Sequence, residues 1–160
     1  MNILFVCTGN ISRSFFAEML LKHEVRQRGL KNIHVSSAGT SAYPGTPADP
    51  KMIKYLSDIG VAVEPHEASP LAKEDVDWAD IIMVMEKRQL NAIRDRWPDA
   101  GDKLELLGSY IAAGPIVDDI SDPYGASIYR YRLAQAQITQ AIKALIKRLF
   151  PEAKKVTARS

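Results

Sequence analysis

The chain has 160 residues, which is enough for one domain to bury a sizeable core without the support of disulfides or metals. Its formal charge is only +2, with acidic and basic residues interleaved, which excludes the concentrated positive field that nucleic-acid binding requires. No apolar run approaches the roughly 20 residues of a membrane span, and the single cysteine cannot form an internal disulfide, so we expect a cytoplasmic protein with no nucleic-acid or membrane partner.

The first predicted elements are a strand, a tight turn and a helix. Residues 2–6 form a short apolar run that ends at Cys7-Thr8-Gly9-Asn10, which is typical of a buried strand and not of a signal peptide. From Arg13 onward, apolar residues recur at helical spacing, and Gly29 stands where a helix-terminating glycine belongs. The turn therefore lies between the carboxyl end of a strand and the start of a helix.

A second strand, a long loop and a second helix follow. Residues 33–37 have the composition of a strand, and residues 38–50 are crowded with Gly, Pro, Ser and Thr, as in a loop. Loops of this length are often functional. Asp49-Pro50 resembles a capped helix start, and Gly60 marks the end of that helix.

The second half of the chain continues the alternation. We expect a strand over residues 81–85, a helix over 87–96, a strand near 103–107, a loop through Tyr124 and a long final helix over 128–149. The run at 81–85 is apolar throughout, which is typical of a parallel sheet covered on both faces. Residues 151–160 are polar and without periodicity, so we expect a disordered tail.

This order predicts an α/β fold: one domain over residues 1–150, with a four-stranded parallel sheet, helices on both faces and right-handed crossovers. Ligands of such sheets bind at the carboxyl ends of the strands. Cys7 follows the first strand directly, so a binding loop is expected between that strand and the first helix.

The segment from Cys7 to Ser14 carries the chemistry. Backbone N–H groups that converge at a helix start form a cradle for a phosphate dianion, and Gly9 and Asn10 tolerate the left-handed conformations that a tight loop needs. Arg13 adds a planar, permanently charged group that can hold two phosphate oxygens. The predicted phosphate-binding residues of the loop are Thr8, Gly9, Asn10, Ile11, Ser12 and Ser14, beside Arg13.

Cys7 is the candidate nucleophile. A lone cysteine is usually a buried spectator, but here the helix dipole and the cradle favour its thiolate, which would lie beneath the bound phosphorus. The cradle could also stabilise the equatorial oxygens of the transition state. Ser14 is close enough in sequence to stabilise the thiolate when it departs in a second step.

The loop resembles the signature of the low-molecular-weight protein tyrosine phosphatases, which reads Cys-x-Gly-Asn-x-Cys-Arg-Ser-Pro. The likeness extends over about residues 1–150. Further matching segments are Ser37-Ala38-Gly39-Thr40, His66-x-Ala68, Ala79-Asp80-Ile81 with Met85, and Asp122-Pro123-Tyr124-Gly125.

The resemblance implies a phosphatase acting on phosphotyrosine in proteins or peptides, without cofactor or metal. Asp122, which the residues alone leave as a plain turn, becomes the general acid that protonates the leaving phenolate and then the base that activates water. Ser37 and His66 become supports that hold Asn10 in a strained conformation. Tyr43 and Tyr124 become walls of a deep cleft that selects aryl phosphates.

Position 11 bears on specificity within this resemblance. Relatives specific for phosphoarginine resemble this loop but tend to carry threonine there, where this chain has Ile11. The resemblance therefore favours phosphotyrosine as the substrate.

Four positions depart from the family pattern: Ser12 replaces the second cysteine, Phe15 the proline, Ser69 an arginine and Glu86 an aspartate. The second cysteine matters most, because an internal disulfide that protects Cys7 is chemically impossible without it.

Two alternatives are weighed against a tyrosine phosphatase. An arsenate reductase of the same fold needs further cysteines to relay a disulfide, and the chain has none. A non-catalytic phosphotyrosine-binding module would be expected to lack the nucleophile or the acid, yet Cys7, Arg13 and Asp122 are all present.

Overall fold

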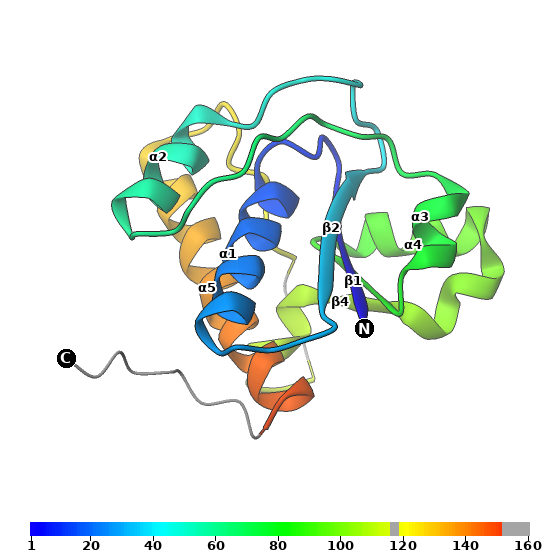
Figure 1. The fold of residues 1–160 in the computed structure, drawn as a ribbon. Helices are drawn as coiled ribbons and strands as arrows, with labels where there is room; N and C mark the ends of the chain where they lie inside the picture. Colours follow the sequence, from blue (N-terminus) through cyan, green and yellow to red (C-terminus); the bar gives the residue numbers. More distant parts are fainter. Residues whose placement is uncertain (116–118, 152–160) are drawn as a thin grey trace.

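The computed structural model of the protein describes residues 1–115 and 119–151 (Figure 1). Its centre is a sheet of four parallel strands in the order β2-β1-β3-β4. The strands are β1 (Asn2–Cys7), β2 (His34–Gly39), β3 (Ile81–Val84) and β4 (Leu104–Leu106). The predicted single-domain α/β fold with a four-stranded parallel sheet is confirmed.

Helices cover both faces of this sheet, as predicted. In Figure 1, α1 and α5 lie on one side of the strands, with α2 beyond them, and α3 and α4 lie on the other. The helices are α1 (Arg13–Gln27), α2 (Pro50–Asp58), α3 (Lys73–Trp78), α4 (Lys87–Arg96) and α5 (Ile128–Leu149), with short 3-10 helices η1 (Pro98–Lys103) and η2 (Leu107–Tyr110). Among the described residues, no helix is both long and apolar enough to cross a membrane.

The sheet has a separate apolar core on each face because alternate residues of a strand point to opposite sides. On β1, Ile3 and Phe5 pack with α1 and α5, whereas Leu4 and Val6 pack with α3 and α4. All four side chains are fully buried, which explains why this strand is apolar throughout instead of alternating. Cys7 ends the strand, paired in register with Gly39 at the end of β2.

The helix boundaries follow the predicted local chemistry. The Asp49 side chain caps α2 by accepting from the Lys51 N–H, and Gly29 and Gly60, just past α1 and α2, have φ of 62° and 81°. Sequence analysis missed the six-residue helix α3. The predicted tail lies outside the described residues except for Pro151.

Candidate active site

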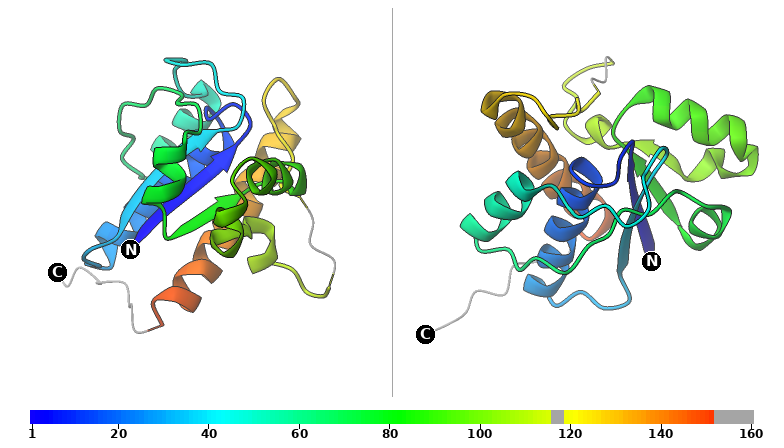
Figure 2. Two further views of the ribbon diagram at one scale, coloured as in Figure 1. Left: turned by 90° about the vertical axis from the view of Figure 1, so that its right-hand side faces the viewer. Right: turned by 90° about the horizontal axis from the view of Figure 1, so that it is seen from above.

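The loop between β1 and α1 lies at the carboxyl edge of the sheet, where the strands end (Figures 1 and 2). It turns back on Cys7: the Asn10 N–H donates to Cys7 Sγ at 3.3 Å, and the Ser14 hydroxyl lies 3.0 Å from the same sulfur. These two polar groups are placed to stabilise a negative charge on sulfur.

A pocket of about 130 Å³ opens above this loop. It joins two segments that are far apart in the sequence, the loop itself and the segment after residue 120. The lining residues are Cys7, Thr8, Gly9, Ile11, Ser12, Arg13, Asp122 and Tyr124. The nucleophile, the arginine and the acid suggested by the sequence therefore surround one space.

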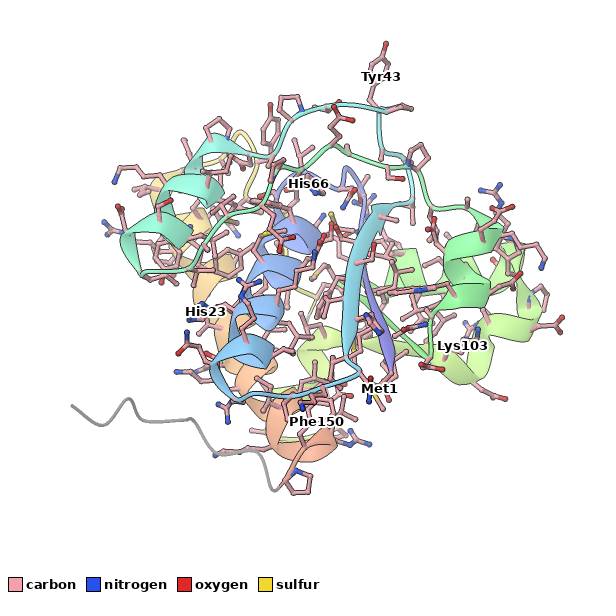
Figure 3. All side chains as sticks on the ribbon, in the orientation of Figure 1. Met1, His23, Tyr43, His66, Lys103 and Phe150 are labelled. Carbon is pink, nitrogen blue, oxygen red and sulfur yellow. The ribbon has the colours of Figure 1, made fainter. Side chains whose placement is uncertain are left out.

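Three other candidate residues lie behind the pocket, and one lies away from it. Asn10, Ser14 and Ser37 are buried, do not line the pocket, and are joined by hydrogen bonds from the Asn10 side chain. Tyr43 is 81% exposed and does not line the pocket; Figure 3 shows its ring pointing outward from the long loop between β2 and α2. Of the two predicted aromatic walls, only Tyr124 lines the pocket.

Asn10 holds the loop in a conformation that its own backbone disfavours. Its φ is 55°, in the left-handed region that asparagine tolerates better than most residues. Its side-chain amide donates to Ser14 Oγ and to Ser37 Oγ, both at 2.9 Å, and its side-chain oxygen accepts from the Ser69 N–H at 2.9 Å. These three hydrogen bonds hold Asn10 in its strained backbone conformation.

The support extends outward from Asn10 through Ser37 and His66. The Ser37 hydroxyl donates to the buried carboxylate of Glu18 at 2.5 Å. His66 Nε2 lies 2.6 Å from the Asn10 carbonyl oxygen, so the ring donates this bond. Phe15 fills the place beside the imidazole, with ring centroids 4.9 Å apart. The predicted supports thus contact the loop, and Ser69 takes part through its backbone despite its departure from the family pattern.

Gly39 braces the loop where no side chain fits. The N–H groups of Thr40 and Ser41 donate to the carbonyls of Cys7 and Thr8 at 2.9 and 3.0 Å. A Cβ atom on Gly39 would lie 2.6 Å from the Thr8 carbonyl oxygen and 3.0 Å from the Asn10 nitrogen. The bare backbone of β2 therefore supports the phosphate loop by direct contact.

Arg13 is almost fully buried, and its guanidinium donates a hydrogen bond to the protein through Nη1. Its Nη1 donates to the Ile120 carbonyl at 2.7 Å and lies 3.2 Å from Glu86 Oε1, while its Nη2 lies 3.8 Å from Asp122 Oδ2. Arg13 Nε and Nη2 and the hydroxyl of Ser12 are buried without a hydrogen-bond partner among the described residues. Buried polar groups need partners, and a tetrahedral oxyanion in the pocket would supply acceptors.

Sequence analysis missed a further set of contacts from the start of α4. The side-chain oxygen of Gln89 accepts from the Met85 and Glu86 N–H groups, and its nitrogen donates to Thr8 Oγ1 at 3.0 Å. Glu86 was noted only as a departure from the family pattern. The ion pair with Arg13 fixes the position of the Glu86 carboxylate, which is one methylene longer than that of aspartate. No local sequence pattern predicts the contact between Gln89 and Thr8.

Asp122 lies at the pocket mouth with its side chain 47% exposed. Its Oδ1 accepts from the Tyr124 N–H at 3.1 Å, which leaves Oδ2 on the side of Arg13. A carboxyl group in this place can exchange protons with both solvent and a bound ligand. Within residues 1–115 and 119–151, no cluster of His, Cys, Asp and Glu side chains could hold a metal ion.

Together these groups can perform nucleophilic chemistry on a phosphoryl group. A sulfur nucleophile lies at the base of the pocket, donors for an oxyanion surround it, and a carboxyl group faces it at the mouth. A phosphorus bound between Cys7 and Asp122 would have its attacking and leaving groups on opposite sides, as in-line displacement requires.

Comparisons with known proteins agree with this chemistry. The family model of low molecular weight phosphotyrosine protein phosphatase matches residues 2–155. The chain is 34% identical to a protein-arginine-phosphatase of Bacillus subtilis over 149 residues, covering 93% of this chain and 97% of the relative. It is also 31% identical to the human low molecular weight phosphotyrosine protein phosphatase, covering 92% of this chain and 94% of the relative.

A solved structure of the YwlE arginine phosphatase superposes on this fold with a TM-score of 0.86 at 32% identity, covering 95% of this chain and 97% of that chain. It is a mutant with a phosphorylated active site serine. In that protein, therefore, the active-site residue carries the phosphoryl group.

Proposed function

Because the chain belongs to the low molecular weight phosphotyrosine protein phosphatase family, we propose that it is a cytoplasmic enzyme that hydrolyses phosphotyrosine in proteins through a phospho-cysteine on Cys7. The observation that carries this proposal is the single pocket shared by Cys7, Arg13 and Asp122. The phosphorylated serine of the related arginine phosphatase supports a covalent intermediate at the corresponding place.

In the first step the Cys7 thiolate forms a bond to phosphorus while the bond from phosphorus to the phenol oxygen breaks. Asp122 gives its proton to that oxygen. Phenolate is a poor leaving group because the pKa of its conjugate acid is about 10, so a positioned acid matters. Arg13 and the loop N–H groups bind the equatorial oxygens.

In the second step the Asp122 carboxylate takes a proton from water as the water oxygen bonds to phosphorus. The bond between phosphorus and sulfur breaks, and phosphate leaves. The returning thiolate is stabilised by the Asn10 N–H and the Ser14 hydroxyl, which already contact the sulfur. One carboxyl group thus serves both steps in opposite protonation states.

Ile11 and Tyr124 support an aryl substrate. Both line the pocket above Cys7, and Tyr124 is 59% exposed at its rim. An apolar wall and an aromatic ring can pack against a phenyl ring. A phosphorylated serine side chain is shorter and would bring its phosphorus less easily to the sulfur.

Phosphoarginine is the second candidate substrate, because curated relatives of this chain are protein-arginine-phosphatases. The guanidinium of that substrate carries several N–H donors, which lose their water when they enter the pocket. The Ile11 side chain offers no acceptor to replace that water, and burying unpaired polar groups costs free energy. Position 11 therefore favours phosphotyrosine over phosphoarginine.

The test compares phosphotyrosine and phosphoarginine peptides of the same sequence. We expect wild type to prefer phosphotyrosine in kcat/KM, Cys7→Ser to lose activity almost completely, and Asp122→Ala to lose about 100- to 10,000-fold. Chelators should have no effect. Equal rates for wild type and Cys7→Ser would remove the mechanism.

The variant Ile11→Thr tests substrate choice separately. It should lower the preference for phosphotyrosine by about 10-fold or more, since a hydroxyl supplies the missing polar partner. A wild-type preference for phosphoarginine would overturn the proposed substrate, phosphotyrosine, but would leave the proposed role of Cys7 as nucleophile intact.

A further inference from the structure

Two buried side chains outside the pocket connect its two halves. The Tyr131 hydroxyl, on the first turn of α5, donates to Asp49 Oδ2 at 2.6 Å. Both residues are almost fully buried, at 1% and 2% exposure, although they are 82 positions apart in the sequence. A buried hydroxyl and carboxylate that satisfy each other define one geometry, because neither has water as an alternative partner.

Asp49 is itself bonded to the phosphate loop. Its backbone N–H donates to the Ile11 carbonyl oxygen at 2.9 Å, and its other carboxylate oxygen accepts from the Lys51 N–H at 3.0 Å. The carboxylate thus fixes the start of α2 with one oxygen and Tyr131 with the other. The hydroxyl of Tyr131 is therefore linked through one residue to the pocket wall at Ile11.

Tyr131 also lies just beyond the segment that carries the proposed acid. That segment leaves the sheet region at Ile120, whose carbonyl accepts from Arg13 and whose N–H donates to the Met85 carbonyl. It passes through Asp122 and enters α5, where Tyr131 is bonded to Asp49. Asp122 therefore lies between two fixed points of the chain. Ile120 on one side is bonded to Arg13, and Tyr131 on the other is linked through Asp49 to Ile11; both Arg13 and Ile11 line the pocket.

We propose that Tyr131 is a positioning residue of this enzyme: through Asp49 its hydroxyl fixes the far end of the acid segment against the Ile11 side of the pocket, and so sets where Asp122 meets the leaving oxygen. This inference rests on the proposed aryl phosphatase activity. Asp122 is half exposed and makes few contacts of its own, so its place depends on the ends of its segment.

The hydrogen bond has a fixed direction over the working range of pH. Burial, and next the hydrogen bond to Asp49, raise the pKa of Tyr131 above its ordinary value of 10.0. The phenol therefore stays protonated and remains the donor of this bond. The contact acts as a constant support and not as a pH switch.

The test uses two substrates that differ in their need for an acid. Phenyl phosphate expels a poor leaving group, whereas 4-nitrophenyl phosphate expels a much weaker base that departs with little help from Asp122. In Tyr131→Phe, which removes only the hydroxyl, we expect kcat/KM to fall about 10-fold for phenyl phosphate and less than about 2-fold for the nitrophenyl ester.

A matched control exists on another part of the molecule. The Tyr110 hydroxyl of η2 also donates to a carboxylate, that of Glu105, but Tyr110 does not line the pocket. The variant Tyr110→Phe removes the same group from the same kind of bond, so it should leave the ratio of the two rates unchanged. Thermal unfolding of both variants measures the loss of stability separately.

Asp49→Asn is the second variant, and it supplies the ratio if Tyr131→Phe does not fold. It keeps an oxygen for the Lys51 N–H but places an NH2 group, which cannot accept the phenol proton, opposite Tyr131, so the same selective loss is expected. Equal losses on both esters, no loss, or the same change in Tyr110→Phe would overturn the role of Tyr131. Wild type that hydrolyses neither ester would instead overturn the proposed function.

Discussion

Replacement of Asn10 by alanine should be one of the most destabilising single changes in the chain. Alanine at φ of 55° costs about 1 kcal/mol of conformational strain relative to a residue that tolerates the left-handed region. The change also removes the side-chain bonds to Ser14, Ser37 and the Ser69 N–H, each contributing about 1 kcal/mol. The sum is a loss of about 4 kcal/mol, a large part of a typical stability of about 5–15 kcal/mol.

A second asparagine provides the matched control. Asn32 has φ of 62° but is exposed at the surface. Asn32→Ala should therefore lose only the conformational part, about 1 kcal/mol. Asn10→Gly should lower the free energy of unfolding by about 3 kcal/mol. It removes the three hydrogen bonds but adds no backbone strain, since glycine adopts positive φ freely.

Urea unfolding at neutral pH measures these three values, provided that the slope of the transition is the same in all variants. The order expected for the loss is Asn10→Ala, then Asn10→Gly, then Asn32→Ala. If Asn10→Ala and Asn32→Ala cost the same, the hydrogen bonds around the phosphate loop contribute nothing to stability, and the account of Asn10 as its central support is wrong.

Two further predictions concern oxidation and pH. Peroxide should inactivate the wild type without forming an internal disulfide, whereas Ser12→Cys should form one with Cys7 and recover with a thiol reductant; recovery of wild type through an internal S–S bond in mass spectrometry would refute this. The hydrogen bond from Lys22 lowers the pKa of Glu64 below its usual 4.5, so this pair stabilises the fold above that pH and the effect is lost as pH falls through the lowered value. Glu64→Gln should therefore cost less than about 1 kcal/mol at pH 7, and the cost, measured from urea midpoints, should shrink as the pH falls below 4.5 through the lowered pKa.

The phosphate loop could be predicted because its chemistry is contiguous. Cys7, Asn10 and Arg13 lie in one short loop between an apolar strand and a helix. This order fixes where the N–H groups and the guanidinium point. The helix ends at Gly29 and Gly60 could be placed for the same reason: a left-handed glycine is a local requirement.

The remaining contacts depend on tertiary packing. The helix α3 has a single buried residue, Val76, in a polar stretch, so it has no apolar stripe to detect. The bonds from Gln89 to Thr8 and from Tyr131 to Asp49 span 81 and 82 positions, which no local spacing predicts. The position of Tyr43 depends on the path of a long loop, and the structure places its ring outside the pocket.

The missing side chain at Gly39 has a consequence for how the protein tolerates change. This residue does not line the pocket, yet any larger residue would press into the backbone that carries the proposed nucleophile. In a mutational scan we would expect substitutions here to be eliminated as strictly as those of reacting groups. Distance from the chemistry is therefore a poor guide to sensitivity in this molecule, because the catalytic turn rests on a surface that admits no added atom.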